Sequence, residues 1–312
     1  MRRLAALIGV AGATSLGLLA LGGPATHATF PDRNGMIAFA GDKGSGSEIY
    51  TIKPDGTRFN RLTHLPFNAL FPDWSPDGSR IAFSREFDEG VYVMNADGSD
   101  LHKVTGPGAG EPAFTPDGHH LVYWCDGCPG GNGVFLIRDD GSDAPGQRLS
   151  SNPFPDQSDE NPEVSPDGQT VTFVRHKVGG KLQALCAVDI DGGHLRRLTT
   201  YRLEVAIKHD WAPNGRQITL TSHADYPDHK SPNVATIKPH GSHLRLLTHH
   251  RGGESGAFTG SYSPNGRRIV YRFENPDRER FRLFKMHPDG THRKLIKRLP
   301  FAPRFSDWAP RP

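Results

Sequence analysis

The chain has 312 residues, of which 36 are glycine and 26 are proline, and 23% of the residues are charged. This length accommodates one large domain or two ordinary ones, and the composition is rich in turns without resembling that of a disordered chain. The formal net charge is only +3, and acidic and basic residues are interleaved along the chain. Because nucleic-acid-binding proteins normally concentrate their basic residues in one patch, we expect no nucleic-acid partner.

The first 28 residues have the layout of a secretory signal peptide. Arg2 and Arg3 form a basic start, an apolar segment rich in Gly and Ala follows, and Thr26 and Ala28 place small residues at the −3 and −1 positions of a cleavage site. An uncleaved membrane anchor is the alternative, because the apolar run approaches the roughly 20 residues that span a bilayer. The small residues and Pro24 favour cleavage near Ala28.

The remainder of the chain, residues 29–312, contains no apolar run long enough to span a membrane. No cysteine lies near Ala28 to accept a lipid. We therefore expect the mature chain to be exported, either secreted or periplasmic, and to have no membrane span.

Two short phrases alternate through this remainder. The first reads Ser-Pro-Asp-Gly or a close variant after an aromatic or apolar residue, and it recurs six times at intervals of 40 to 51 residues. The copies are WSPDG, FTPDG, VSPDG, WAPNG, YSPNG and a truncated WAP. The second phrase, of the type IYTIKPDGTRFNRLT, also occurs six times. This period is typical of β-propeller blades.

Each phrase combines β-forming residues with turn residues. In Ser75-Pro76-Asp77-Gly78, the proline presets φ and the glycine suits the exit of a type I turn. The second phrase consists of a strand, an Asp-Gly turn and a short strand that ends in Leu-Thr. In the second copy the pattern predicts strands at 71–74, 80–85, 91–95 and 102–105. No helical periodicity follows residue 30, so we predict an all-β fold of four-stranded antiparallel blades.

The two ends of the chain complement each other. The first copy begins near residue 34 without the leading aromatic strand, and the last residues, RFSDWAPRP, supply such a strand with nothing after it. We predict a six-bladed β-propeller over residues 29–312 whose ring is closed by its N- and C-terminal strands, which removes exposed edges. The aromatic residues of the first phrase should then pack between neighbouring blades.

The repeat P-x-W-S-P-D-G-x-x-I-A-F, followed by I-Y-x-x-x-x-D-G-x-x-x-x-x-L-T, resembles the WD-like propeller repeats of the TolB family. The resemblance extends over essentially the whole chain after the signal, and it implies six blades and protein binding at the cell envelope. TolB itself carries an α/β domain before the propeller, whereas the first blade here begins within ten residues of Ala28. Similar repeats accompany the peptidase domains of prolyl oligopeptidase-like enzymes, but the G-x-S-x-G nucleophile elbow is absent.

The three cysteines fall into two groups. Cys125 and Cys128 form a C-x-x-C in a loop rich in Gly and Pro between two strands. In an exported protein a local disulfide is the preferred interpretation, with a metal or redox site as the alternative. Cys186 aligns with Tyr50 and Tyr92 in its repeat, so we expect a buried, inert thiol.

The loop SHADYPDHKSPN contains four residues that could gather around a divalent metal, namely His223, Asp225, Asp228 and His229. Loops rich in His and Asp are more often simply solvated. We therefore expect no cofactor, with a divalent metal ion as the alternative.

The innermost strand of each blade supplies the best candidate site, because alternate residues of a strand that lines the axis point into the channel. The residue before each aromatic reads Asp73, Ala113, Glu163, Asp210, Ser261 and Asp307. Two positions earlier the residues are Phe71, Glu111, Asn161, Lys208, Thr259 and Phe305. If either set faces the channel, its carboxylates would form an acidic funnel for a cation or a basic peptide. Alternatively, they bind backbone amides of adjacent strands and fix the turn.

The sequence therefore favours an exported, monomeric, non-enzymatic scaffold that binds an envelope or secreted protein or peptide. The alternative is a small propeller lyase or hydrolase that acts on polysaccharide with a metal or carboxylate site in the funnel. Propellers support both roles, so the fold alone does not decide between them.

Overall fold

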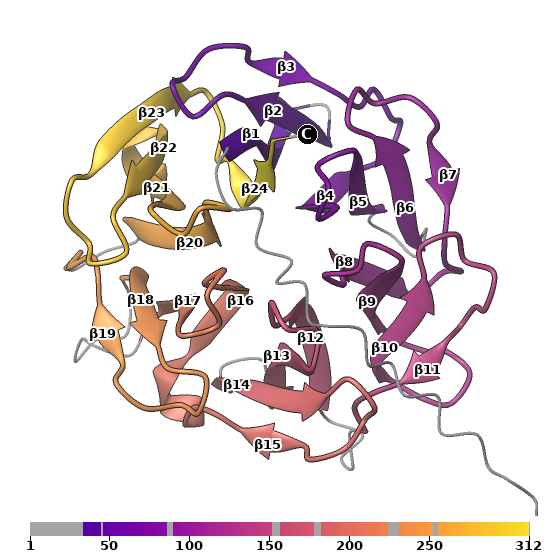
Figure 1. Cartoon of the computed structure of the whole chain (residues 1–312). Helices are drawn as coiled ribbons and strands as arrows, with labels where there is room; N and C mark the ends of the chain where they lie inside the picture. Colours follow the sequence, from indigo (N-terminus) through magenta and orange to yellow (C-terminus); the bar gives the residue numbers. More distant parts are fainter. Residues whose placement is uncertain are drawn as a thin grey trace, which may run out of the picture.

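The computed structural model describes residues 34–44, 46–85, 90–151, 157–177, 182–223, 231–251 and 255–311. Their strands form six four-stranded sheets, arranged as blades around a central axis (Figure 1). Two 3-10 helices, η1 (Tyr201–Leu203) and η2 (Pro276–Arg278), are the only helical elements within these ranges. The predicted six-bladed, all-β propeller is confirmed. The predicted signal peptide lies outside the described residues.

Each blade runs from an inner strand at the axis to an outer strand at the rim. Blade 1 contains β24 (Arg304–Pro310), β1 (Asn34–Asp42), β2 (Ser47–Ile52) and β3 (Asn60–Arg61). Blade 2 contains β4 (Ala69–Trp74), β5 (Arg80–Arg85), β6 (Gly90–Asn95) and β7 (His102–Lys103). Blade 3 contains β8 (Ala109–Phe114), β9 (His120–Cys125), β10 (Gly133–Arg138) and β11 (Gln147–Arg148).

The remaining blades repeat this order. Blade 4 contains β12 (Gln157–Val164), β13 (Thr170–Lys177), β14 (Leu182–Asp189) and β15 (Arg196–Arg197). Blade 5 contains β16 (Val205–Trp211), β17 (Ile218–Ser222), β18 (Asn233–Ile237) and β19 (Arg245–Leu246). Blade 6 contains β20 (Gly256–Tyr262), β21 (Ile269–Asn275), β22 (Arg280–Met286) and β23 (Lys294–Leu299). The four strands expected in the second copy lie within two residues of those in blade 2.

The ring closes where the two ends of the chain meet. β24 pairs antiparallel with β1 in the order β24-β1-β2-β3, with Trp308 opposite Ile37 and Asp307 opposite Ala38. Figure 1 shows β24 as the inner strand of the blade that begins the chain. The backbones approach so closely that a Cβ on Gly35 would clash with the carbonyl of Pro310. The predicted closure by both termini is therefore confirmed.

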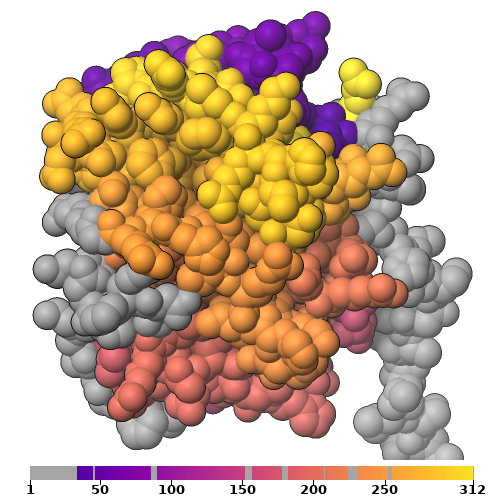
Figure 2. All heavy atoms as spheres, turned by 90° about the vertical axis from the view of Figure 1, so that its left-hand side faces the viewer, coloured from indigo at the N-terminus to yellow at the C-terminus, as the bar shows by residue number. Residues whose placement is uncertain are grey.

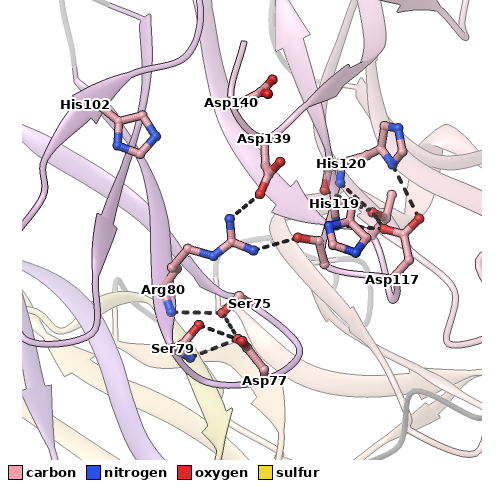
Figure 3. A network of polar contacts seen from close by, with 12 residues as sticks. Ser75, Asp77, Ser79, Arg80, His102, Asp117, His119, His120, Asp139 and Asp140 are labelled. Atoms are coloured by element: carbon pink, nitrogen blue, oxygen red, sulfur yellow. Dashed lines mark hydrogen bonds and ion pairs between the residues drawn. The ribbon is translucent and has the colours of Figure 1, made fainter. Parts of the chain in front are cut away.

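The Ser-Pro-Asp-Gly turns are held by their own side chains. In blade 2, the Ser75 Oγ accepts the Arg80 N–H (2.9 Å), and the Asp77 carboxylate accepts the Ser79 N–H (3.0 Å). The Arg80 side chain then reaches blade 3, where it pairs with Asp139 and donates to the Gly118 carbonyl (2.7 Å) (Figure 3). The turn chemistry thus fixes a blade's own hairpin and also connects it to the next blade.

The Leu-Thr endings of the second phrase also have a structural role. The hydroxyl accepts a backbone N–H from the third strand of its blade at 2.8 to 3.0 Å. The donors and acceptors are Ile49 to Thr63, Val91 to Thr105, Val134 to Ser150, Leu185 to Thr199 and Val234 to Thr248. Blade 6 has no hydroxyl residue at 295–297, and there the outer strand continues for six residues instead of two.

The aromatic residues of the first phrase belong to the core, as expected. Trp74, Phe114, Trp211, Tyr262 and Trp308 are at most 8% exposed. Each of these residues packs in a hydrophobic cluster that contains side chains of two neighbouring blades. Burial of one such ring contributes about 2–3 kcal/mol at ordinary transfer energies, so blade-to-blade packing is a main source of stability.

Candidate functional site

Both sets of residues predicted at the axis are present there, but at different depths. The outer layer forms a cup of about 170 Å³ on the side where the Ser-Pro-Asp-Gly turns lie. Its wall includes the proline of each of the six copies of the first phrase, together with the aromatic residue, or in one copy the valine, that precedes it. Its charged lining consists of Asp73, Glu163, Asp210 and Asp307. In the two remaining blades the equivalent residues are Ala113 and Ser261, of which only Ser261 lines the cup.

Three of these carboxylates also bind the backbone of the next blade. Asp307 accepts the Trp74 N–H at 2.9 Å, Asp73 accepts the Phe114 N–H at 2.8 Å, and Asp210 accepts the Tyr262 N–H at 2.6 Å. The two sequence interpretations, an acidic funnel and a backbone clamp, therefore hold together. One oxygen of each group is occupied between the blades, and the group still contributes to the lining of the cup.

The fourth carboxylate has a different partner. Glu163 forms an ion pair with the ammonium of Lys208, and each side chain is only 11% exposed. Burial works against the charged form of Lys208, but attraction from Glu163, Asp307, Asp73 and Asp210 outweighs it, so the pKa of Lys208 is raised. Four carboxylates thus face one cation, and the group is formally three charges negative when fully ionised.

Burial and repulsion between charges make Asp73, Asp210 and Glu163 hold protons more tightly. Burial raises the pKa of Asp73 well above its ordinary value, and the charges of Asp307 and Glu163 add to the effect. The pKa of Asp210 is raised well above its ordinary value by burial and then by Glu163. Burial also raises the pKa of Glu163, although Lys208 opposes it. A bound cation would relieve this repulsion, so the cup is suited to positive charge.

The inner layer closes the axis below the cup. Phe71 and Phe305 stack with their ring centroids 3.8 Å apart. With Glu111, Asn161 and Lys208 they surround a cavity of only about 10 Å³. Thr259, the sixth residue of this set, instead contacts the hydroxyl of Thr219 (2.8 Å). A ligand that enters the cup therefore meets a floor of side chains and not an open channel.

Four residues of the inner layer have an unusual backbone conformation. Phe71, Glu111, Asn161 and Phe305 have φ between 50° and 56°, in the left-handed region that non-glycine residues rarely adopt. Such residues cost on the order of 1 kcal/mol each, and they tend to gather at functional sites. Here the same geometry recurs in four blades, which indicates that a fixed floor is part of the design of the axis.

Glu111 is the buried acid of the floor. Its carboxylate accepts the Asn161 N–H at 2.7 Å, which joins blade 3 to blade 4. Burial raises the pKa of Glu111 to about 8, and the charge of Glu160 contributes to the shift. Glu111 does not line the cup above it, so it offers a matched control for the acids that do.

The other candidate residues lie away from the axis. Cys125 and Cys128 are joined by a disulfide with their Cα atoms 5.8 Å apart. Cys186 is buried, and burial raises the pKa of its thiol to about 12. A second cavity of about 370 Å³ lies between blades 6 and 1, beside Phe281 and Phe301. No sequence motif predicts this cavity, because its lining combines strand residues from two blades with the connection at 300–302.

The metal hypothesis concerns residues that are mostly outside the described ranges. Asp225, Asp228 and His229 lie there. His223 is described, and its Nδ1 lies 3.1 Å from the Glu204 carbonyl while its ring contacts Phe258 edge-on. Among the residues that the structure describes, no group of three His, Cys, Asp or Glu side chains is arranged to hold a metal ion.

The fold and the axial cup define a six-bladed β-propeller with an acidic, closed-bottomed site on its turn face. The model of the TolB beta propeller domain family matches residues 64–229 and 109–311. The chain belongs to this family.

Individual relatives agree with this assignment. The Protein TolB homolog of Chlorobium luteolum is 29% identical over 146 residues, which are 46% of this chain and 32% of the relative. The chain therefore spans about a third of that relative's length. The crystal structure of TolB from Acinetobacter baumannii has a TM-score of 0.68 at 22% identity, covering 89% of this chain and 67% of that one.

A more distant likeness is also relevant. An oligogalacturonate lyase in complex with manganese has a TM-score of 0.53 at 12% identity, covering 86% of this chain and 73% of that one. At such identities both structures show a shared fold alone. In the described part of the chain, no helix has the length and apolar character needed to cross a membrane.

Proposed function

We propose that this protein is an exported, non-enzymatic scaffold that binds a basic segment of an envelope protein in its axial cup. The observation that carries this proposal is the arrangement of four inward carboxylates above a closed floor, in which Lys208 is the single cation that they face. A Lys or Arg side chain from the partner would enter from the turn face and supply the missing positive charge. The aromatic and proline wall would contact its apolar stem.

The size of the cup supports a protein ligand over a sugar. Sites for drug-sized molecules usually have volumes of about 300–1,000 Å³, whereas the cup measures about 170 Å³. This volume suits one inserted side chain or chain terminus better than a sugar chain with several rings. The rest of the partner would lie on the turn face, where the hairpin turns of all six blades are presented.

The setting of the proposal follows from the family and from the N-terminal sequence. The family resemblance supports a protein or peptide partner in the envelope, and a Tol–Pal-type assembly is the first system to examine. The basic and apolar start of the chain supports export, and we place the mature protein in the periplasm or outside the cell. We propose that it acts as a monomer, because the ring is closed by its own two ends.

A lyase or hydrolase acting on polysaccharide is the second candidate. The observation in its favour is the raised pKa of Asp73 and Asp210, because an acid that keeps its proton to a higher pH than usual can donate it to a leaving group. The likeness to an oligogalacturonate lyase supports this candidate at the level of fold. Against it, one oxygen of each acid is already bound to a neighbouring blade.

A capture experiment tests the proposal. The exported chain and a variant with Asp73→Asn, Glu163→Gln, Asp210→Asn and Asp307→Asn would be immobilised and exposed to envelope proteins. The amide side chains keep an acceptor for each backbone N–H, so the variant should fold while the cup loses its negative charge. Glu111→Gln changes a carboxyl group of the floor, outside the lining of the cup, and is the matched control.

We expect the wild type and Glu111→Gln to retain the same protein, and the fourfold variant to lose it. Equal retention by all three would place the binding surface elsewhere and exclude the cup. If no protein is retained and the wild type cleaves an acidic polysaccharide that the variant leaves intact, the scaffold is wrong and the enzyme is supported.

A further inference from the structure

Positive charge is concentrated in one blade of the ring. Residues 256–299, which form blade 6, contain eleven of the 37 Lys and Arg residues and four of the 34 Asp and Glu residues. This blade therefore has a formal charge of +7, while the rest of the chain has −4. The expectation that charges are interleaved throughout is wrong for this blade, and its charge has the opposite sign to that of the cup.

The basic side chains of blade 6 are largely without acidic partners. Arg272 pairs with Glu274 at 3.2 Å, and among the described residues it is the only Lys or Arg of this blade in a salt bridge. Across the outer hairpin, Arg282 lies opposite Arg298, and Lys285 lies opposite Lys294. Like charges directly opposite each other on neighbouring strands are destabilising. The blade retains this arrangement at two of the five paired positions of β22 and β23.

The strand that carries these charges is also the exception among the outer strands. β23 has six residues, whereas β3, β7, β11, β15 and β19 have two each. It is the last strand in the order β20-β21-β22-β23, so its outer edge has no neighbour in the sheet. Figure 1 shows it on the rim, and the yellow surface of this blade faces the viewer in Figure 2.

The exposed side chains of β23 fit an acidic strand. Lys294, Leu295 and Arg298 are exposed, and Lys297 is half-buried with its ammonium 5.5 Å from the centre of the Phe59 ring. Lysines on an edge strand can also serve to prevent unwanted pairing. That device does not explain why this strand alone is long, since the other five outer strands avoid pairing by being short.

We propose that β23 is a second docking site, which adds an extended acidic segment of a partner protein as a fifth strand of blade 6. The Ile296 carbonyl of this edge already lies against Gly56 of blade 1, so the backbone groups to either side of it would provide the pairing, and the Lys and Arg side chains would select Glu and Asp at alternating positions. This site is on the rim, so it can be occupied together with the axial cup and does not depend on what the cup binds.

The test is a binding titration of the purified chain with a fluorescent eight-residue peptide of alternating Thr and Glu. Two further peptides carry N-methyl groups on either the odd or the even backbone nitrogens. Because successive N–H groups of a strand point to opposite edges, strand addition predicts that one methylated peptide binds like the parent and the other loses at least about tenfold in affinity.

Charge exchange supplies the second arm. The triple variant Lys294→Glu, Lys297→Glu and Arg298→Glu should bind the acidic peptide with an affinity at least about tenfold lower. It should also gain binding to a Thr-Lys peptide of the same length. The matched control makes the same change on short outer strands, with Lys103→Glu, Arg196→Glu and Arg197→Glu. It should bind the acidic peptide like the wild type. Hydrogen exchange should show new protection of amides in β23.

Several results would overturn the proposal. The proposal is wrong if the wild type does not bind the acidic peptide, or if both methylated peptides bind equally well. It is also wrong if the two triple variants lose the same affinity for the acidic peptide. Equally tight binding of polyphosphate or duplex DNA would show a general polyanion surface instead of strand addition. Recovery of binding by the Thr-Lys peptide guards against a variant that has simply failed to fold.

Discussion

The side chain of Asp307 accepts the backbone N–H of Trp74 at 2.9 Å, and the two residues are 233 positions apart in the chain. Asp307 is in the last inner strand, and Trp74 begins the first complete turn of the ring. The bond therefore lies beside the seam between the two ends of the propeller. The same residue lines the cup, so the closure of the ring and the proposed ligand site share one carboxylate.

Replacing this carboxylate should separate its two roles. Asp307→Ala leaves the buried Trp74 N–H without its partner and should lower the free energy of unfolding by about 1–3 kcal/mol. Asp307→Asn keeps an acceptor and removes a charge from a repulsive group, so it should remain within about 1 kcal/mol of the wild type. Urea denaturation of both variants checks this. Equal losses would show that the charge, and not the hydrogen bond, matters at the seam.

Glu111 should give the fold a specific pH dependence. Its pKa rises from 4.5 when unfolded to about 8 when folded, so the native state holds the extra proton between these values. Stability from this group is therefore lost as pH rises through that window. Glu111→Gln should match the wild type at pH 4.5 and exceed it by about 1–3 kcal/mol at pH 8.5.

Thermal melts of both proteins at several pH values check this prediction. Glu160→Gln removes the charge near Glu111, so it should only partly reduce the decrease in melting temperature with rising pH. A Gln variant that follows the wild-type curve at every pH would contradict the buried, protonated state of Glu111.

Lys208 should be essential to the cup at neutral pH. Lys208→Met removes the only cation among its carboxylates and leaves Glu163 buried without a partner, which should cost about 3–5 kcal/mol at pH 7.5. At pH 4.5 the acids can take up protons, so the loss should shrink. Lys208→Arg keeps the charge, so it should lower the free energy of unfolding by less than Lys208→Met does. A loss that is independent of pH would indicate a packing defect instead.

The disulfide should have a small and local effect. Only two residues lie between Cys125 and Cys128, and the stabilisation from a cross-link grows with the length of the loop that it closes. Cys128→Ser should therefore lower the free energy of unfolding by no more than about 1–2 kcal/mol. Cys125 is fully buried, so Cys125→Ser also buries a hydroxyl and should cost more. Similar melting temperatures for the two variants would contradict this order.

Much of the fold could be predicted from the sequence because its signals are local. The Ser-Pro-Asp-Gly turn is stabilised by residues within five positions of one another, and it or a close variant recurs in five of the six blades. The incomplete copies at the two ends indicate the seam directly. Even the position of the axial acids follows from the alternation of residues along the inner strand.

The details of the site depend on contacts between distant residues, which a single sequence does not reveal. The pairing of Glu163 with Lys208 arises only when blades 4 and 5 pack together, and the stacking of Phe71 on Phe305 arises only when the ring closes. The left-handed conformation of Glu111 has no local signal such as glycine. The charge of blade 6 was visible in the sequence, but an average over the whole chain concealed it.

The seam also sets an order of events during synthesis. β24 supplies Phe305 to the floor and Asp307 and Trp308 to the wall. None of these is in place until the ribosome has released the end of the propeller and β24 has reached β1. The cup is thus completed last, and an unfinished or C-terminally clipped chain would lack the proposed binding site. Competence to bind would then report that the whole ring has been made.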